Sequence, residues 1–251
     1  MKPILVLQMQ RMGDLILSFP LFLWLQRAFP GRPIWVAAEE RFFRPLMPLS
    51  PKVTYFPWSG AKVLLKQDYG LVLNLSVQPR AAELAGQVRA EEKLGPVVED
   101  GCRRVCGRWQ LYRQSLVQNN RYNRFHWADL NALDVIPLKE MRTTHFDTPR
   151  RLTEEQVKVG LFLGASEEAK RPTPKFWAQL VRALLDRGLR PALLGGPAER
   201  PLGVEVAKAF GGPVLNLCGK LDLDELAAVG QTLQLLVTPD TGPMHLAAWT
   251  G

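Results

Sequence analysis

Small and polar residues gather at three points in the second half of the chain, each directly after a short apolar run. The clusters are Gly164-Ala165-Ser166 with Lys170, Gly195-Gly196 with Glu199, and Asp240-Thr241-Gly242-Pro243-Met244-His245. Small residues let a ligand approach the backbone, and the free N–H groups at a helix start attract phosphate oxygens. A lysine adds a cation suited to a diphosphate, and a carboxylate can accept hydrogen bonds from ribose hydroxyls. Three such clusters therefore favour a nucleotide-binding site.

One carboxylate in the first half of the chain could do a different kind of chemistry. Asp14 follows the apolar run 4–7 and precedes a helical pattern, so it should lie in the loop after the first strand. A carboxylate there could act as a general base that takes the proton from a hydroxyl during its attack. It could equally cap the helix that follows, and the two roles can coexist.

The residues of the three clusters also have purely structural interpretations. Lys170 and Arg171 could be a solvated pair, and Glu199 could only favour the dipole of the helix that it begins. Asp240 could be an acid at a helix start, and His245 a core histidine with a satisfied hydrogen bond. The joint pattern, rather than any single residue, favours the site.

The elements that must position these residues are predicted from alternating apolar runs and amphipathic segments, which indicate parallel strands joined by right-handed crossovers. Predicted strands are residues 4–7, 34–38, 71–75, 159–163, 191–194, 214–217 and 233–237. Predicted helices are residues 15–29, a helix that begins at Thr173-Pro174 and stops at Gly188, 198–210, 224–230 and one that begins near Pro243. Ligands of such doubly wound sheets bind at the carboxyl ends of the strands, where all three clusters should lie.

The polar stretch 137–156 has no clear period and predicts a domain boundary. We place a first domain at residues 1–150 and a second at residues 151–251. Because the sequence stops just after a helix that should lead into another strand, the second domain is expected to be incomplete.

Composition is that of an ordinary globular protein, with 251 residues of which 47% are hydrophobic and 22% charged. Three cysteines are too few for a disulfide framework and fit a reducing compartment. The longest apolar stretch near the N-terminus, residues 15–25, is interrupted by Pro20 and is shorter than the roughly 18 residues of a membrane span. We therefore expect neither a span nor a signal peptide, and a cytoplasmic location.

The net charge of +8 lies entirely in the first part of the chain. Residues 1–150 hold 21 Lys and Arg against 13 Asp and Glu, whereas residues 151–251 hold 11 of each. Six arginines and no acidic residue fall within residues 101–125: Arg103, Arg104, Arg108, Arg113, Arg121 and Arg124. This asymmetry predicts an anionic partner, either nucleic acid, a membrane surface or a phosphorylated substrate, unless it is a solvated basic face. Because no nucleic-acid motif accompanies the arginines and their neighbouring aromatic residues, we favour a phosphorylated lipid acceptor on an anionic membrane.

Three other patterns are weaker. Asp222-Leu223-Asp224 resembles a metal-binding motif of sugar transferases, but it precedes a short helix, for which Asp224 is a natural N-cap. Cys102 and Cys106 lack the second pair of a zinc site. No G-x-G-x-x-G follows the first strand, so a nicotinamide dehydrogenase is unsupported. We predict no metal site.

The motifs together resemble glycosyltransferase family nine, the bacterial lipopolysaccharide heptosyltransferases. The resemblance rests on the three clusters, on Cys218-Gly219-Lys220 before Leu223-Asp224-Glu225-Leu226, and on Arg11-Met12-Gly13-Asp14 at the opening strand, loop and helix. The run from Asp240 to His245 is its most specific part. The resemblance covers roughly the first 35 and the last 95 residues of the chain.

This resemblance implies a GT-B fold, in which two Rossmann-like domains face each other across a cleft. The family uses an ADP-activated heptose as donor and a lipid-linked core oligosaccharide as acceptor, inverts the anomeric centre and needs neither metal nor cofactor. Asp14 is then expected to be the general base and Lys170 to stabilise the leaving ADP. Expected donor-binding residues are Gly13, Ser166, Lys170, Glu199, Asp240, Thr241, Gly242 and His245, and the six arginines should bind the acceptor.

We therefore predict an inverting heptosyltransferase of lipopolysaccharide biosynthesis, cytoplasmic and peripheral to the inner membrane, with no nucleic-acid partner. Two alternatives stay open. One is a related transferase that uses a different nucleotide sugar. The other is a non-catalytic protein that binds a nucleotide or an anionic lipid on the same scaffold.

Overall fold

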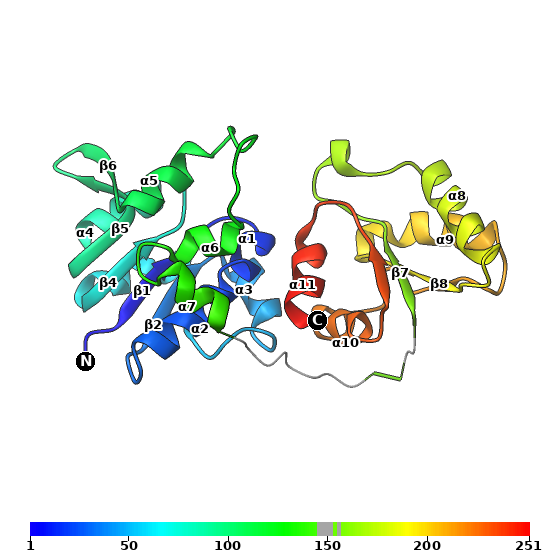
Figure 1. The fold of residues 1–251 in the computed structure, drawn as a ribbon, viewed down its shortest axis with the longest axis horizontal. Coiled ribbons are helices and arrows are strands. Elements are labelled where there is room, and N and C mark those ends of the chain that lie inside the picture. Colours follow the sequence, from blue (N-terminus) through cyan, green and yellow to red (C-terminus); the bar gives the residue numbers. More distant parts are fainter. Residues whose placement is uncertain (145–152, 155–156) are drawn as a thin grey trace. The chain divides into compact units, whose positions relative to one another are not determined.

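The computed structural model describes residues 1–144, 153–154 and 157–251, which belong to two compact units, Met1–Phe146 and Asp147–Gly251 (Figure 1). Each unit is built around one β-sheet with helices packed against it. The predicted domain boundary between residues 150 and 151 lies outside the described residues. The α/β class predicted from the alternating pattern is confirmed.

The first unit holds a six-stranded sheet with the order β3-β2-β1-β4-β5-β6. Its strands are β1 (Ile4–Leu7), β2 (Ile34–Ala38), β3 (Thr54–Pro57), β4 (Asp68–Asn74), β5 (Arg89–Glu99) and β6 (Cys102–Cys106). The strands at 4–7, 34–38 and 71–75 were predicted, although β4 is longer than expected, whereas β3, β5 and β6 were not. All four residues of β1 are buried, as expected for a central parallel strand covered on both faces.

The last strand of this sheet departs from the predicted parallel pattern, because β6 pairs with β5 in the antiparallel sense. The two strands are joined by Asp100 and Gly101, whose φ angles of 51° and 74° are those of a tight hairpin turn. A two-residue connection can join only antiparallel strands, so the expectation of a purely parallel sheet is wrong here.

Helical elements of the first unit connect the strands. They are α1 (Met12–Ile16), α2 (Phe19–Ala28), α3 (Glu40–Phe43), α4 (Pro79–Gln87), α5 (Arg108–Ser115), α6 (Trp127–Ala132) and α7 (Leu138–Thr143), with 3₁₀ turns η1 (Arg44–Leu46) and η2 (Trp58–Lys66). The single helix predicted over residues 15–29 is wrong, because the chain breaks between α1 and α2. Pro20 lacks an N–H group and its ring would clash with the carbonyl of Ile16, so the helix restarts with Pro20 in the first turn of α2.

The second unit holds a fully parallel sheet with the order β10-β7-β8-β9. Its strands are β7 (Val159–Phe162), β8 (Pro191–Leu194), β9 (Leu215–Asn216) and β10 (Leu235–Val237), and its helices are α8 (Pro174–Leu185), α9 (Arg200–Lys208), α10 (Leu223–Gly230) and α11 (Gly242–Thr250). Short 3₁₀ turns η3 (Glu168–Lys170) and η4 (Pro197–Glu199) precede α8 and α9. All four predicted strands are present, with ends that differ by up to two residues.

Helix starts in this unit follow the capping chemistry of the sequence. Thr173 accepts a hydrogen bond from the backbone N–H of Phe176 and is the N-cap of α8, as predicted. The predicted cap of α10 is wrong, because Asp222 rather than Asp224 accepts the hydrogen bond from the N–H of Glu225, at 2.8 Å. The carboxylate of Glu225 in turn accepts a hydrogen bond from the N–H of Asp222, which completes a capping box.

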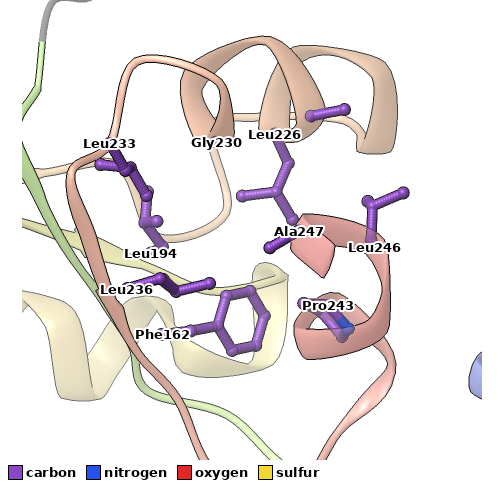
Figure 2. Close-up of a pocket in the computed structure, with 10 residues that line it drawn as sticks. Phe162, Leu194, Leu226, Gly230, Leu233, Leu236, Pro243, Leu246 and Ala247 are labelled. Carbon is purple, nitrogen blue, oxygen red and sulfur yellow. The ribbon is translucent and has the colours of Figure 1, made fainter. Parts of the chain in front are cut away.

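Two hydrophobic cores cover the two faces of the second sheet, which makes it doubly wound. On one face Val159 and Leu161 of β7 pack with Trp177 of α8 and Val206 of α9. On the other face Phe162 contributes to an apolar pocket beneath α10 and α11 (Figure 2). The pocket is lined by Phe162, Leu194, Leu226, Ala227, Gly230, Leu233, Leu236, Pro243, Leu246 and Ala247. Because these residues offer no charged side chain, the pocket belongs to the core and is unsuited to a diphosphate.

Candidate functional site

The order of the second sheet reverses between β7 and β10, so its switch point lies at the loops that follow these two strands. Lys170 lies in the loop after β7, and its Nζ donates a hydrogen bond of 2.7 Å to Oδ2 of Asp240 in the loop after β10. Glu167 Oε2 lies 3.8 Å from the same ammonium. The first and third polar clusters therefore meet at this point, as the edge of a parallel sheet predicts.

Electrostatics link a third residue to this pair. The hydrogen bond from Lys170 is the main cause that lowers the pKa of Asp240, and the charges of Lys170 and His245 lower it further. His245 lies in the first turns of α11 and is half-buried. Lys170, Asp240 and His245 thus form one electrostatically linked group, which we call the donor-edge group after the role that the sequence predicts for it.

The second cluster joins the first through Glu199. Its carboxylate accepts a hydrogen bond of 2.9 Å from the N–H of Gly196 and so caps the turn η4. A Cβ added to Gly164 would lie 2.4 Å from Cδ of Glu199, and one added to Gly195 would lie 2.6 Å from its Cβ. The two glycines therefore make room for the side chain of Glu199. The capping role is observed, and the predicted ribose contact stays a prediction.

Helix α11 begins at Gly242, two residues after Asp240, and presents its first N–H groups beside the donor-edge group. Thr241 is the N-cap, and its side chain makes no capping hydrogen bond. Gly242 is the first helical residue, and no Cβ there covers the backbone. A nine-residue helix with such a start attracts an anion through both its N–H groups and its dipole. Ser166 is exposed in the loop after β7.

Arg171 is exposed, as the solvated pair that the sequence allowed would be, but it also makes a hydrogen bond within the loop. Its Nε donates a hydrogen bond of 2.6 Å to the carbonyl of Ala165. The guanidinium therefore braces the loop after β7 that carries Lys170.

In the first unit, the strand order reverses between β1 and β4, and Asp14 lies just after β1 in the one-and-a-half turns of α1. Its Oδ2 accepts a hydrogen bond of 3.2 Å from the N–H of Arg11 in a capping box, and the side chain is half-buried. The cap of a helix from residue 15 that the sequence offered is therefore wrong: Asp14 lies inside α1, and its carboxylate binds the N–H of the N-cap residue Arg11. Gly13, assigned to the donor from the sequence, is buried beside Asp14 in this first unit.

Five of the six arginines of residues 101–125 are exposed, namely Arg103, Arg104, Arg108, Arg121 and Arg124. Arg104 pairs with Glu99 across the β5–β6 hairpin. Large apolar side chains are exposed among these arginines: Leu111 is 59% and Tyr122 74% exposed. The segment thus presents both positive charge and apolar surface.

Arg113 is different, since it is only 2% exposed. Its Nη2 donates a hydrogen bond of 2.7 Å to the carbonyl of Leu75 at the end of β4, and its guanidinium carbon lies 5.1 Å from the centre of the Trp127 ring. Burial lowers the pKa of Arg113 to about 10, although the negative charge of Asp14 acts in the opposite direction. Within the described residues its Nε has no hydrogen-bond partner.

The sequence carried a signal for this burial. Gln110 and Leu116, three residues to either side of Arg113, are also buried and lie on the same helix face. Because the prediction used charge alone, it placed Arg113 among its exposed neighbours. The position of Arg113 on the buried face of the helix explains why its side chain is buried instead.

Neither a metal site nor a membrane-spanning helix is found among the described residues. No three His, Cys, Asp or Glu side chains there gather closely enough to hold a metal ion. Nor is any helix in that part of the chain long and apolar enough to cross a bilayer.

Two α/β units, each with polar groups at the switch point of its sheet, define the GT-B class of two-domain Rossmann-like proteins. Solved structures share this fold. Glycosyltransferase family 9 from Veillonella parvula aligns with a TM-score of 0.72 and 21% identity, over 100% of this chain and 78% of that one. ADP-heptose LPS heptosyltransferase II of Escherichia coli aligns with a TM-score of 0.69 and 21% identity, over 99% of this chain and 82% of that one.

A model of glycosyltransferase family 9 (heptosyltransferase) matches residues 58–250, and the chain belongs to this family. Among curated relatives, lipooligosaccharide heptosyltransferase 2 of Haemophilus influenzae is 31% identical over 122 residues, which are 46% of this chain and 35% of that protein. Lipopolysaccharide heptosyltransferase 1 of E. coli is 22% identical over 98% of this chain and 84% of that protein. The first match thus covers about a third of the length of the relative. The family and the GT-B class predicted from the motifs are confirmed.

Proposed function

We propose that the protein transfers a heptose from ADP-heptose to a lipid-linked lipopolysaccharide core acceptor. The observation that carries the proposal is the donor-edge group, in which Lys170 and Asp240 meet beside the uncapped start of α11. Family membership supports it, because a solved relative is the E. coli heptosyltransferase WaaC with ADP and another structure of it holds ADP-2-deoxy-2-fluoro heptose.

On the donor side, the second domain binds the nucleotide sugar. The ammonium of Lys170 and the N–H groups of Thr241 and Gly242 bind the diphosphate, whose negative charge increases as the sugar leaves. When the nucleotide binds, the ammonium of Lys170 leaves Asp240 and contacts a phosphate oxygen instead. Asp240 and His245 then bind sugar or phosphate oxygens. Ser166 lies in the same loop as Lys170. The carboxylate of Glu199, which caps η4, accepts hydrogen bonds from ribose hydroxyls.

On the acceptor side, Asp14 is the general base. Its carboxylate takes the proton of an acceptor hydroxyl as that oxygen forms a bond to the anomeric carbon of the heptose. The bond between this carbon and the β-phosphate oxygen breaks at the same time, and ADP leaves with the electron pair. Attack from the face opposite the leaving group inverts the anomeric centre. Metal-independent transfer is part of the proposal, with the cation of Lys170 offsetting the charge of ADP.

The exposed arginines bind the phosphorylated acceptor and the anionic inner-membrane surface from the cytoplasm. Each basic residue near such a surface contributes about 1 kcal/mol, and the contribution falls with salt. Exposed Leu111 and Tyr122 add apolar contact with the lipid. Sedimentation with anionic liposomes tests this part: neutralising Arg103, Arg104 and Arg108 should weaken binding, and RNA that binds more tightly than lipid at matched salt would contradict it.

The transfer itself is tested by incubating the protein with ADP-heptose and a lipid-linked lipopolysaccharide core acceptor, and measuring the glycoside product by mass spectrometry. We expect one heptose added for each ADP released, and no product with UDP-glucose. Product from another nucleotide sugar would instead establish the related transferase. ADP binding without any product would instead favour a non-catalytic nucleotide-binding protein on the same scaffold.

A further inference from the structure

At the break between α1 and α2, side chains bind the carbonyl of Asp14 in place of the backbone N–H that a continuous helix would supply. In such a helix the N–H of Ser18 would donate to this carbonyl, but here it donates to the carbonyl of Leu15, at 3.0 Å. Two side chains replace it. Oγ of Ser18 donates to the Asp14 carbonyl at 2.9 Å, and Nε2 of Gln8 donates to it at 3.3 Å.

These two side chains form one buried network. Nε2 of Gln8 also donates to Oγ of Ser18 at 2.9 Å, and the two residues are 2% and 0% exposed. Gln8 follows β1 directly, and its own N–H donates to the carbonyl of Ala37 in β2 at 3.0 Å. The carbonyl of Asp14 is therefore tied through Gln8 to the rigid centre of the first sheet.

A five-residue helix cannot hold its own orientation, because nearly all its carbonyls depend on partners outside it. Whatever fixes α1 thus fixes the direction of the Asp14 carboxylate. Asn131 of α6 also holds the residue that follows α1, since its Nδ2 donates to the carbonyl of Leu17 at 3.2 Å. Buried hydrogen bonds of this kind are costly to remove, because the group left behind has no water to replace its partner.

We propose that Gln8 is a positioning residue for the reaction, which with Ser18 holds Asp14 in the orientation needed to take the acceptor proton. This inference rests on the proposed role of Asp14 as the base. Gln8 acts through the backbone of Asp14 and touches no substrate. A displacement of about 1 Å at a reacting group can cost a factor of about 100 in rate, so the effect should appear in turnover.

The test is Gln8→Met, which keeps the length of the side chain and removes both hydrogen bonds. Its matched control is Gln110→Met. Gln110 is 1% exposed, and its Nε2 donates to the carbonyl of Leu130, at 3.4 Å. Both glutamines have an Oε1 without a hydrogen-bond partner within the described residues, so the two substitutions remove similar groups.

We expect Gln8→Met to lower kcat at least tenfold while the KM for ADP-heptose and the Kd for ADP stay within twofold. Gln110→Met should keep kcat within twofold. If Gln8→Met keeps the original kcat, or if both variants lose turnover equally, the inference is overturned. Should Gln8→Met fail to fold, Ser18→Ala removes the other donor and should lower kcat severalfold, with an unchanged kcat counting against the network.

Combining Gln8→Met with Asp14→Asn separates this inference from the proposed function. If Gln8 acts through Asp14, the double variant turns over no more slowly than Asp14→Asn alone. Independent, multiplying losses would show that Gln8 acts elsewhere. Asp14→Asn with full activity would overturn the proposed base itself, whereas an inactive Asp14→Asn beside a fully active Gln8→Met would overturn only the role of Gln8.

Discussion

Replacing Arg113 by methionine should change the free energy of unfolding by no more than about 1 kcal/mol, although the side chain is only 2% exposed. Burial lowers its pKa well below the ordinary value of an arginine, to about 10. Each pKa unit is worth about 1.4 kcal/mol, so burying this charge costs about 3–4 kcal/mol. The hydrogen bond to Leu75 returns about 1.5–3 kcal/mol, and the contact with Trp127 about 0.5–2 kcal/mol. These contributions nearly cancel.

Methionine keeps much of the apolar stem and needs no charge to be desolvated. The carbonyl of Leu75 also stays satisfied, because Nε2 of Gln10 donates to it at 3.2 Å. The pKa in the folded protein lies below that of the unfolded chain, so the cost is fully present below pH 10 and decreases only above it. Measurements near neutral pH therefore do not depend on the exact pH.

Urea unfolding followed by circular dichroism measures the change, with Arg108→Met, an exposed arginine of the same helix, as the control. Turnover should respond differently from stability: we expect kcat/KM for the acceptor to fall at least tenfold in Arg113→Met, because the charge lies within electrostatic reach of Asp14. A loss of 3 kcal/mol or more with unchanged turnover would refute the reasoning and make Arg113 a structural residue.

Three further predictions follow from single positions. Gly95→Ala should destabilise the protein by about 3 kcal/mol or more in urea unfolding. The φ angle of Gly95 is +91°, and a Cβ there would lie 2.0 Å from a backbone oxygen of β4. A loss of stability below about 1 kcal/mol would contradict this prediction. Lys170→Met should raise the pKa of Asp240 toward its ordinary value in an NMR titration, while stability changes by less than about 1 kcal/mol because the pair is solvent-exposed; an unmoved pKa would contradict the contact. Cys218 should resist alkylation at pH 8, because burial raises its pKa to about 12, whereas the exposed Cys102 should react. Mass spectrometry measures the labelling of each cysteine, and equal labelling of the two would contradict the burial of Cys218.

Strands with an uninterrupted apolar run could be predicted from the sequence, and strands formed mainly by pairing could not. Residues 4–7 and 191–194 are buried throughout and were found at their observed bounds. By contrast, β5 begins with charged, largely exposed residues and β6 carries two exposed arginines. These segments are strands because a neighbouring strand supplies their hydrogen bonds, and the local sequence pattern does not reveal this pairing.

The contact between Lys170 and Asp240 was predictable for a similar reason. The carboxyl ends of parallel strands share one edge of the sheet, which brings the two residues together across 70 residues of sequence. The support of Asp14 was not predictable. Gln8 has no distinctive sequence pattern, and its role arises only because the chain breaks after α1. Pro20 was the available signal for that break, and it was interpreted only as an interruption of an apolar run.

Single-turnover measurement of Asp14→Asn tests the central claim most directly. The protein is first saturated with ADP-heptose, then mixed with acceptor and quenched at increasing times, so that only the transfer step is measured. We expect the rate of product formation to fall by a factor of about 100 or more, the typical size of a general-base contribution. The Kd for ADP should stay within twofold, because the donor-edge group belongs to the other domain. Product formed by Asp14→Asn at nearly the original rate would contradict the account.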